Sequence, residues 1–189
     1  MRLISKRMTM TLAAFVLLGA GAVLASPSAA SPDSSAYLSG RASTLLAEIQ
    51  KETTQLGLHA ETLGTFAWKP QSHWQSHATY LDLVKGHVNA VGERTAELQR
   101  ISHAVLPWQQ KAISEVTGHV AQVAASTQAA IDHLRENQNR LFVSEYRDHL
   151  TTIADRSGEM KETVDKFLDY EKAEQKSQQL KDELELSGD

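Results

Sequence analysis

The chain contains no cysteine, and this absence removes several kinds of structure and chemistry at once. Disulfides, thiolate metal centres, a cysteine nucleophile and covalently attached c-type haem all require that residue. A lipoprotein anchored through a lipidated cysteine is excluded for the same reason. The fold must therefore rest on its packed core, which a domain of about 160 residues is large enough to form.

Motifs for catalysis and for phosphate binding are also missing. The sequence has no glycine-rich phosphate loop, no Gly-x-Ser-x-Gly elbow and no pattern that indicates a catalytic triad. A ferritin-like di-iron site needs Glu-x-x-His pairs, whereas Glu115 and Glu145 each precede a histidine by four residues. We therefore expect a protein that is not an enzyme.

The sequence also has too few cations to bind polyanions. Three of its Lys and Arg residues lie in the first seven positions, and the rest of the chain carries 16 of them against 23 Asp and Glu, a net charge of −7. Binding to a nucleic-acid backbone or to anionic lipid depends on clustered cations. We expect no nucleic-acid partner and no adsorption to lipid.

Residues 1–25 have the pattern of a secretory signal peptide. Arg2, Lys6 and Arg7 precede an apolar run over 12–24, and small residues follow that run. An uncleaved membrane anchor is the alternative, but the run is short for a span of about 20 residues. Since no later stretch is apolar enough to cross a bilayer, we expect a secreted or periplasmic protein with no stable membrane insertion after cleavage.

From residue 37 onward, apolar residues recur at spacings of three and four through four successive segments. This spacing places them on one face of a helix, as in helical bundles and coiled coils. We call these residues the apolar stripe: Leu38, Ala42, Leu45, Ile49, Leu56, Leu63 and Phe66; Trp74, Leu81, Val84, Val88, Val91, Leu98 and Val105; Ile113, Val116, Val120, Val123, Ala130 and Leu134; Tyr146, Leu150, Ile153, Met160, Val164 and Phe167.

Breaks at Pro70, at Pro107 and near 137–140 divide the stripe into helices over about 37–66, 72–105, 107–137 and 144–170. Ser72 and Ser144 are the expected N-caps of the second and fourth helices. Short connections make neighbouring helices antiparallel. The sequence therefore predicts an all-α, up-down-up-down four-helix bundle over 37–170, after a flexible Ser/Ala/Pro spacer over 26–36 and before a polar tail over 171–189.

The turn lengths also predict which stripe residues meet. Folding the two hairpins at their turns places Leu56 beside Val84 and Leu134 beside Tyr146, and we expect all four residues in one layer. Polar residues interrupt the stripe at Glu52, Thr95, Ser102, Thr127 and Ser157. They either specify the register or form an internal polar site. A small apolar ligand beside Ala42, Thr95 and Ser157 is a further hypothesis.

Histidine is the residue type best suited to a binding site, and the chain has eight. His73 and His77 stand four residues apart, so both imidazoles lie on one helix face, as a helical metal site requires. His59 and His149 are expected at the same end of the bundle and could complete a site for Zn, Cu or Ni. Histidines with this spacing also occur as ordinary surface or core residues, so no cofactor is the alternative.

Two functions follow from these observations. The first is an exported, non-enzymatic interaction or structural module of the cell envelope, which binds a protein partner or a second copy of itself through its helix faces or tail. The second is a periplasmic transition-metal-binding protein that uses the histidines at one end of the bundle.

Overall fold

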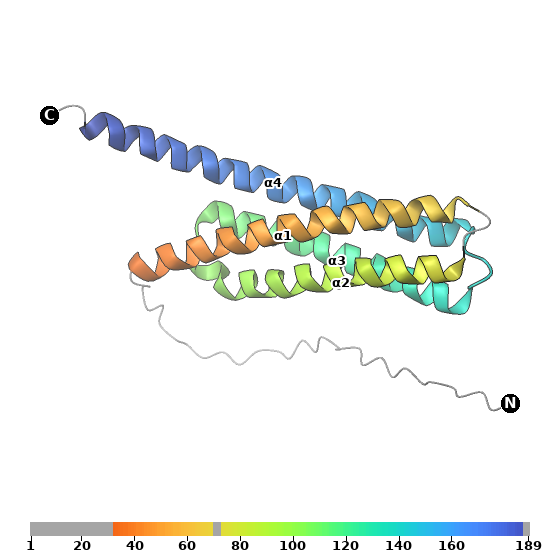
Figure 1. The fold of residues 1–189 in the computed structure, drawn as a ribbon. Helices are drawn as coiled ribbons and strands as arrows, with labels where there is room; N and C mark the ends of the chain where they lie inside the picture. Colours follow the sequence, from red (N-terminus) through yellow and green to blue (C-terminus); the bar gives the residue numbers. More distant parts are fainter. Residues whose placement is uncertain (1–31, 70–72, 187–189) are drawn as a thin grey trace, which may run out of the picture.

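The computed structural model describes residues 32–69 and 73–186. These residues form four long helices, and no strand occurs among them. The elements are α1 (Pro32–Ala67), α2 (Trp74–Ile101), the short 3₁₀ helix η1 (Ser102–Ala104), α3 (Pro107–Glu136) and α4 (Ser144–Leu186). Figure 1 shows the four helices side by side along one long axis, with the C-terminal part of α4 projecting beyond the others. None of these described helices carries a stretch apolar enough to span a bilayer.

Helix boundaries follow the local signals in most places. Pro107 is the first residue of α3, a position where its missing N–H is not needed for helical hydrogen bonding. α1 begins at Pro32 rather than Tyr37, so it includes part of the predicted spacer. α4 continues to Leu186, which makes the predicted polar tail helical. The predicted signal peptide and Ser72 lie outside the described residues.

Each helix packs against two neighbours. α1 and α3 both pack along α2 and along α4, with only a marginal approach of α1 to α3. Within the described ranges, α2 and α4 have no Cα atoms within 8 Å of each other. These two helices therefore lie diagonally across the bundle, and only long side chains can connect them.

Polar contacts at the helix boundaries record the order in which residues meet. Between α1 and α2, Arg41 pairs with Glu97 at 2.8 Å and Glu52 pairs with His87 at 2.8 Å. Residue numbers rise along α1 as those of the contacted residues fall along α2. The same order holds between α3 and α4, where the rings of Trp108 and Phe167 stack, as do those of His133 and Tyr146.

The core consists of the apolar stripe with small adjustments at its edges. The buried stripe residues include Leu45, Ile49, Leu56, Val84, Val91, Val116, Leu150, Ile153 and Met160. Glu52 was expected on the stripe, but its neighbour Thr53 is buried instead and donates to the Ile49 carbonyl at 2.8 Å. Glu52 lies at the stripe edge, from which its carboxylate reaches His87 and Arg94.

The layer expected from the turn lengths is wrong between the two hairpins. Leu56 lies with Val88, Val120 and Met160 around one point of the core that leaves no room for water. Tyr146 lies instead beside His77, near the connection between α1 and α2. Turn lengths set the register within each hairpin, but α1 and α2 can slide as a unit past α3 and α4 without changing either turn.

Two leucines on α1 test the core directly. Leu56 is fully buried, whereas Leu58 is 52% exposed. We expect Leu56→Ala to lower the free energy of unfolding by about 2–5 kcal/mol, because it removes buried apolar surface and leaves a cavity. Leu58→Ala is the matched control and should change it by less than about 0.5 kcal/mol. Urea denaturation followed by circular dichroism measures both; equal losses would contradict this core.

Candidate functional site

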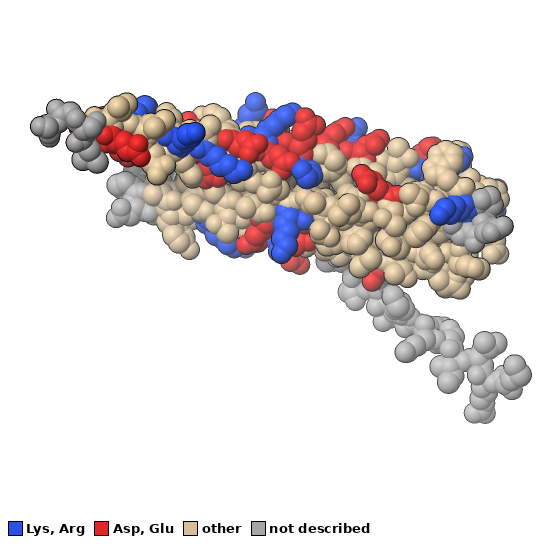
Figure 2. Space-filling model, turned by 45° about the horizontal axis from the view of Figure 1, so that its top comes forward, with Lys and Arg blue, Asp and Glu red and all other residues tan. Residues whose placement is uncertain are grey.

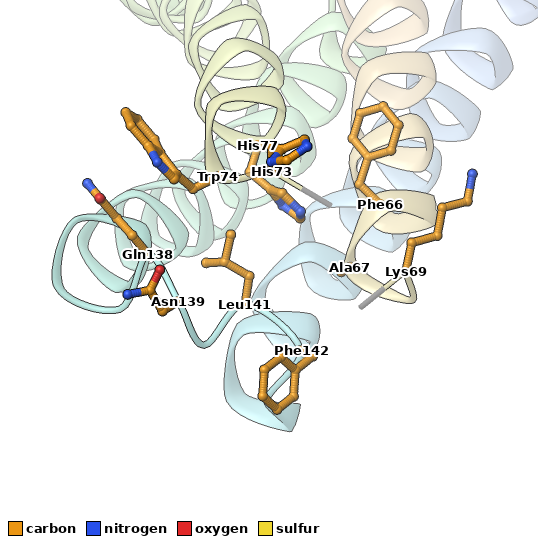
Figure 3. Close-up of a pocket in the computed structure, with 10 residues that line it drawn as sticks. All are labelled: Phe66, Ala67, Lys69, His73, Trp74, His77, Gln138, Asn139, Leu141 and Phe142. Atoms are coloured by element: carbon orange, nitrogen blue, oxygen red, sulfur yellow. The ribbon is translucent and has the colours of Figure 1, made fainter. Parts of the chain in front are cut away.

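A pocket of about 230 Å³ opens at the end of the bundle where α1 meets α2. Its described walls come from the end of α1, the start of α2 and the connection between α3 and α4 (Figure 3). The apolar side chains are Phe66, Ala67, Trp74, Leu141 and Phe142, and the polar ones are Lys69, His73, His77, Gln138 and Asn139. The cavity is therefore an aromatic and aliphatic cup with polar groups at several points of its wall.

His77 is the most unusual residue of this pocket. It occupies a stripe position on α2, four residues before Leu81, and its side chain is fully buried. Nδ1 lies 3.0 Å from the hydroxyl of Tyr146, which is also fully buried. The two residues come from helices that lie diagonally across the bundle, so the hydrogen bond passes through the core.

Aromatic rings enclose this hydrogen bond. The ring of Phe66 meets the His77 imidazole edge-on with centroids 6.1 Å apart, and the imidazole of His133 stacks on the Tyr146 ring at 5.1 Å. All four helices contribute one of these rings. The polar pair is thus held inside an aromatic cluster that closes this end of the core.

The protonation of the pair follows from its burial. Desolvation lowers the pKa of the His77 imidazole and raises the pKa of the Tyr146 hydroxyl, so both side chains are neutral near pH 7. The buried phenol O–H needs an acceptor, and Nδ1 is the atom at hydrogen-bond distance. We therefore assign O–H donation from Tyr146 to Nδ1, which leaves the proton of the imidazole on Nε2.

Nε2 of His77 is buried and has no hydrogen-bond partner within the protein. An unsatisfied buried donor of this kind costs about 1–3 kcal/mol. Buried polar groups in folded proteins are usually satisfied, so an orphaned one beside a cavity indicates an acceptor that comes from outside the chain.

The four histidines predicted as metal ligands are placed differently from one another. His73 and His77 both line the pocket, although His73 is exposed and His77 is buried. His59 is half-buried and stacks on the imidazole of His87 with centroids 5.3 Å apart. His149 is half-buried on α4, one turn after Tyr146. Within residues 32–69 and 73–186, no three His, Asp or Glu side chains are grouped to hold one metal ion. The metal site stays a prediction from the sequence.

Sequence reasoning missed Tyr146 and Lys69 as pocket-end residues. Tyr146 was recognised only as a stripe residue, because its contact with His77 depends on the register between the hairpins. The one available signal was that a histidine and a tyrosine both occupy stripe positions close to a predicted turn. Such residues need polar partners when they are buried.

Comparison of the chain with known protein families, with curated proteins and with solved structures finds no match.

The buried imidazole predicts a specific pH dependence of stability. An unfolded histidine takes up a proton near pH 6.5, whereas folded His77 does so only at lower pH. The unfolded state thus binds more protons in this window, and the free energy of unfolding should fall as the pH drops from 7 towards 5. His77→Gln should show a shallower fall, measured by urea denaturation at several pH values.

Exposed His103 provides the matched control. His103→Gln should keep the slope of the parent protein. An unchanged slope in His77→Gln would contradict the assignment of a neutral, buried imidazole.

Proposed function

We propose that this chain is an exported, non-enzymatic module that acts by protein association, with a second copy of itself as partner. It would be an antiparallel up-down-up-down bundle in the periplasm or outside the cell, and its association surface would be the C-terminal part of α4. The observation that carries this proposal is a second apolar stripe on that part of the helix.

The projecting part of α4 has lost the stripe that faces the bundle. The buried positions Met160, Val164 and Leu168 continue, at spacings of three and four, as Glu171, Gln175, Gln178 and Asp182. From Lys172 to Glu185 every described side chain is exposed. A helix this polar on its former core face has no reason to fold back onto its own bundle.

A different face of the same segment carries apolar residues. Tyr170, Ala173, Ser177, Leu180 and Leu184 recur at spacings of three and four, and the two leucines are 50% and 72% exposed. This second stripe has the spacing of a two-stranded coiled coil. Its first ring, Tyr170, contacts Trp108 at the end of the bundle with centroids 5.8 Å apart.

The charges beside the second stripe select the orientation of a partner helix. Lys and Glu residues alternate along this part of α4, which Figure 2 shows as interspersed blue and red at the projecting end. In a parallel pair, the two sides of the stripe face each other across the interface. Asp169 would then meet Glu174, and Lys176 would meet Lys181, so the contacts would join like charges.

An antiparallel pair reverses this outcome, because each side of the stripe then faces the same side of its partner. Glu174 of one copy would face Lys181 of the other, and Lys176 would face Glu183. Two-fold symmetry forms each of these opposite-charge pairs twice. The charge pattern therefore favours an antiparallel homodimer through α4. A stripe of this length favours weak, concentration-dependent association.

Substitution of one lysine distinguishes the two orientations. Lys181→Glu should weaken self-association roughly tenfold in the antiparallel dimer, because two attractive contacts become repulsive. A parallel dimer would instead be strengthened, since Lys176 would gain an acidic partner. Sedimentation velocity over a range of protein concentrations measures the dissociation constant. The double variant Glu174→Lys, Lys181→Glu should restore association.

Lys172→Glu is the matched control, because it makes the same charge change away from the second stripe and should leave association unchanged. Leu180→Asp should abolish association while the bundle stays folded. A parent protein that is monomeric at every concentration would contradict self-association through α4.

A further inference from the structure

The pocket at the other end of the bundle has the electrostatics of an anion site. Its described lining includes the ammonium group of Lys69 and the imidazole of His73, and it contains no Asp or Glu side chain. This composition contrasts with a chain that carries more acidic than basic residues overall. A negatively charged ligand would meet attractive groups here and no carboxylate of the described wall.

The start of α2 adds to the attraction for anions. His73 occupies the N-cap position, and its side chain makes no capping hydrogen bond. The first turn of α2 also contains no acidic residue. The first N–H groups of a helix have no partner within the helix, and the helix dipole places partial positive charge there. Both Trp74 and His77 of this first turn line the pocket.

The buried imidazole supplies the second, independent observation. Nε2 of His77 has no partner, and the hydrogen bond from Tyr146 to Nδ1 keeps the proton on Nε2. The pocket wall therefore holds a fixed hydrogen-bond donor that lacks an acceptor. A carboxylate oxygen is the strongest acceptor that a small biological molecule offers such a donor.

The remaining walls define the body of the ligand. Phe66, Trp74 and Phe142 bring aromatic rings to the cavity, and Leu141 lines it as well (Figure 3). A cavity of about 150 Å³ can hold benzene, so the 230 Å³ here leaves space for one ring with a short acidic substituent. Apolar walls with a few polar groups are typical of small-molecule sites.

We propose that this pocket binds a small carboxylic acid with a planar, apolar body, such as an aryl acid. The carboxylate accepts a hydrogen bond from Nε2–H of His77 and lies near the ammonium group of Lys69 and the start of α2. The ring occupies the aromatic cup. This site is separate from the second stripe on α4 and does not depend on self-association.

Isothermal titration calorimetry and ¹H–¹⁵N NMR titration with phenylacetate test the proposal, with phenylacetamide as the neutral control of similar shape. Phenylacetate should bind saturably near pH 7 and shift amide signals around residues 66–77 and 138–142. Phenylacetamide should bind at least tenfold more weakly, because it offers a weaker acceptor and no negative charge.

Three variants separate the contributions to binding. His77→Phe keeps an aromatic ring but removes the donor, and it should weaken phenylacetate binding tenfold or more. Lys69→Gln changes an exposed residue, so it preserves the fold and should weaken binding about threefold. Lys51→Gln, at an exposed position on α1 outside the pocket, is the charge-matched control and should have no effect.

Several results would overturn the proposal. Equal affinity for the acid and the amide would mean that the cup selects only apolar shape. No saturable binding of phenylacetate would mean that Nε2 is satisfied by water alone. ZnCl₂ binding that is lost in both His73→Gln and His77→Gln would mean that Nε2 is an unprotonated metal ligand. If His77→Phe fails to fold, an unchanged affinity in Lys69→Gln would still count against the carboxylate site.

Discussion

The hydrogen bond between His77 and Tyr146 is the constraint on which the rest of this structure depends. It joins α2 to α4, which lie diagonally across the bundle and share no close backbone approach in the described ranges. Apolar stripes with a spacing of three and four can pack in several registers that differ by one heptad. A buried polar pair is satisfied in only one of them, so it selects a register as a polar residue does in a coiled-coil core.

That same contact determines the chemistry of the bundle end. Because the phenol proton goes to Nδ1, the imidazole must carry its own proton on Nε2, and this atom faces no acceptor of the chain. The pocket beside it has aromatic walls and no described acidic side chain. The opposite end of the molecule differs, since α4 continues there as a charged helix with two exposed leucines. The bundle thus separates a small-molecule pocket from an association surface by its full length.

The sequence predicted the helices well because their causes are local. Spacings of three and four define the stripe, and Pro107 begins α3 where it was expected. The contact of His77 with Tyr146 could not be predicted, because it joins residues 69 positions apart and depends on how the hairpins slide past each other. The second stripe was hidden for a different reason: Leu180 and Leu184 lie one helical step away from the positions that continue the first stripe, so the tail reads as polar throughout.

The protonation of His77 is the most direct test of this account. Long-range ¹H–¹⁵N NMR spectra of the imidazole, recorded near pH 7, distinguish the two neutral tautomers from the imidazolium form. The account predicts a neutral ring with the proton on Nε2, an unprotonated Nδ1, and nuclear Overhauser contacts to the ring of Tyr146. A proton on Nδ1, a charged imidazolium, or no contact with Tyr146 would contradict it.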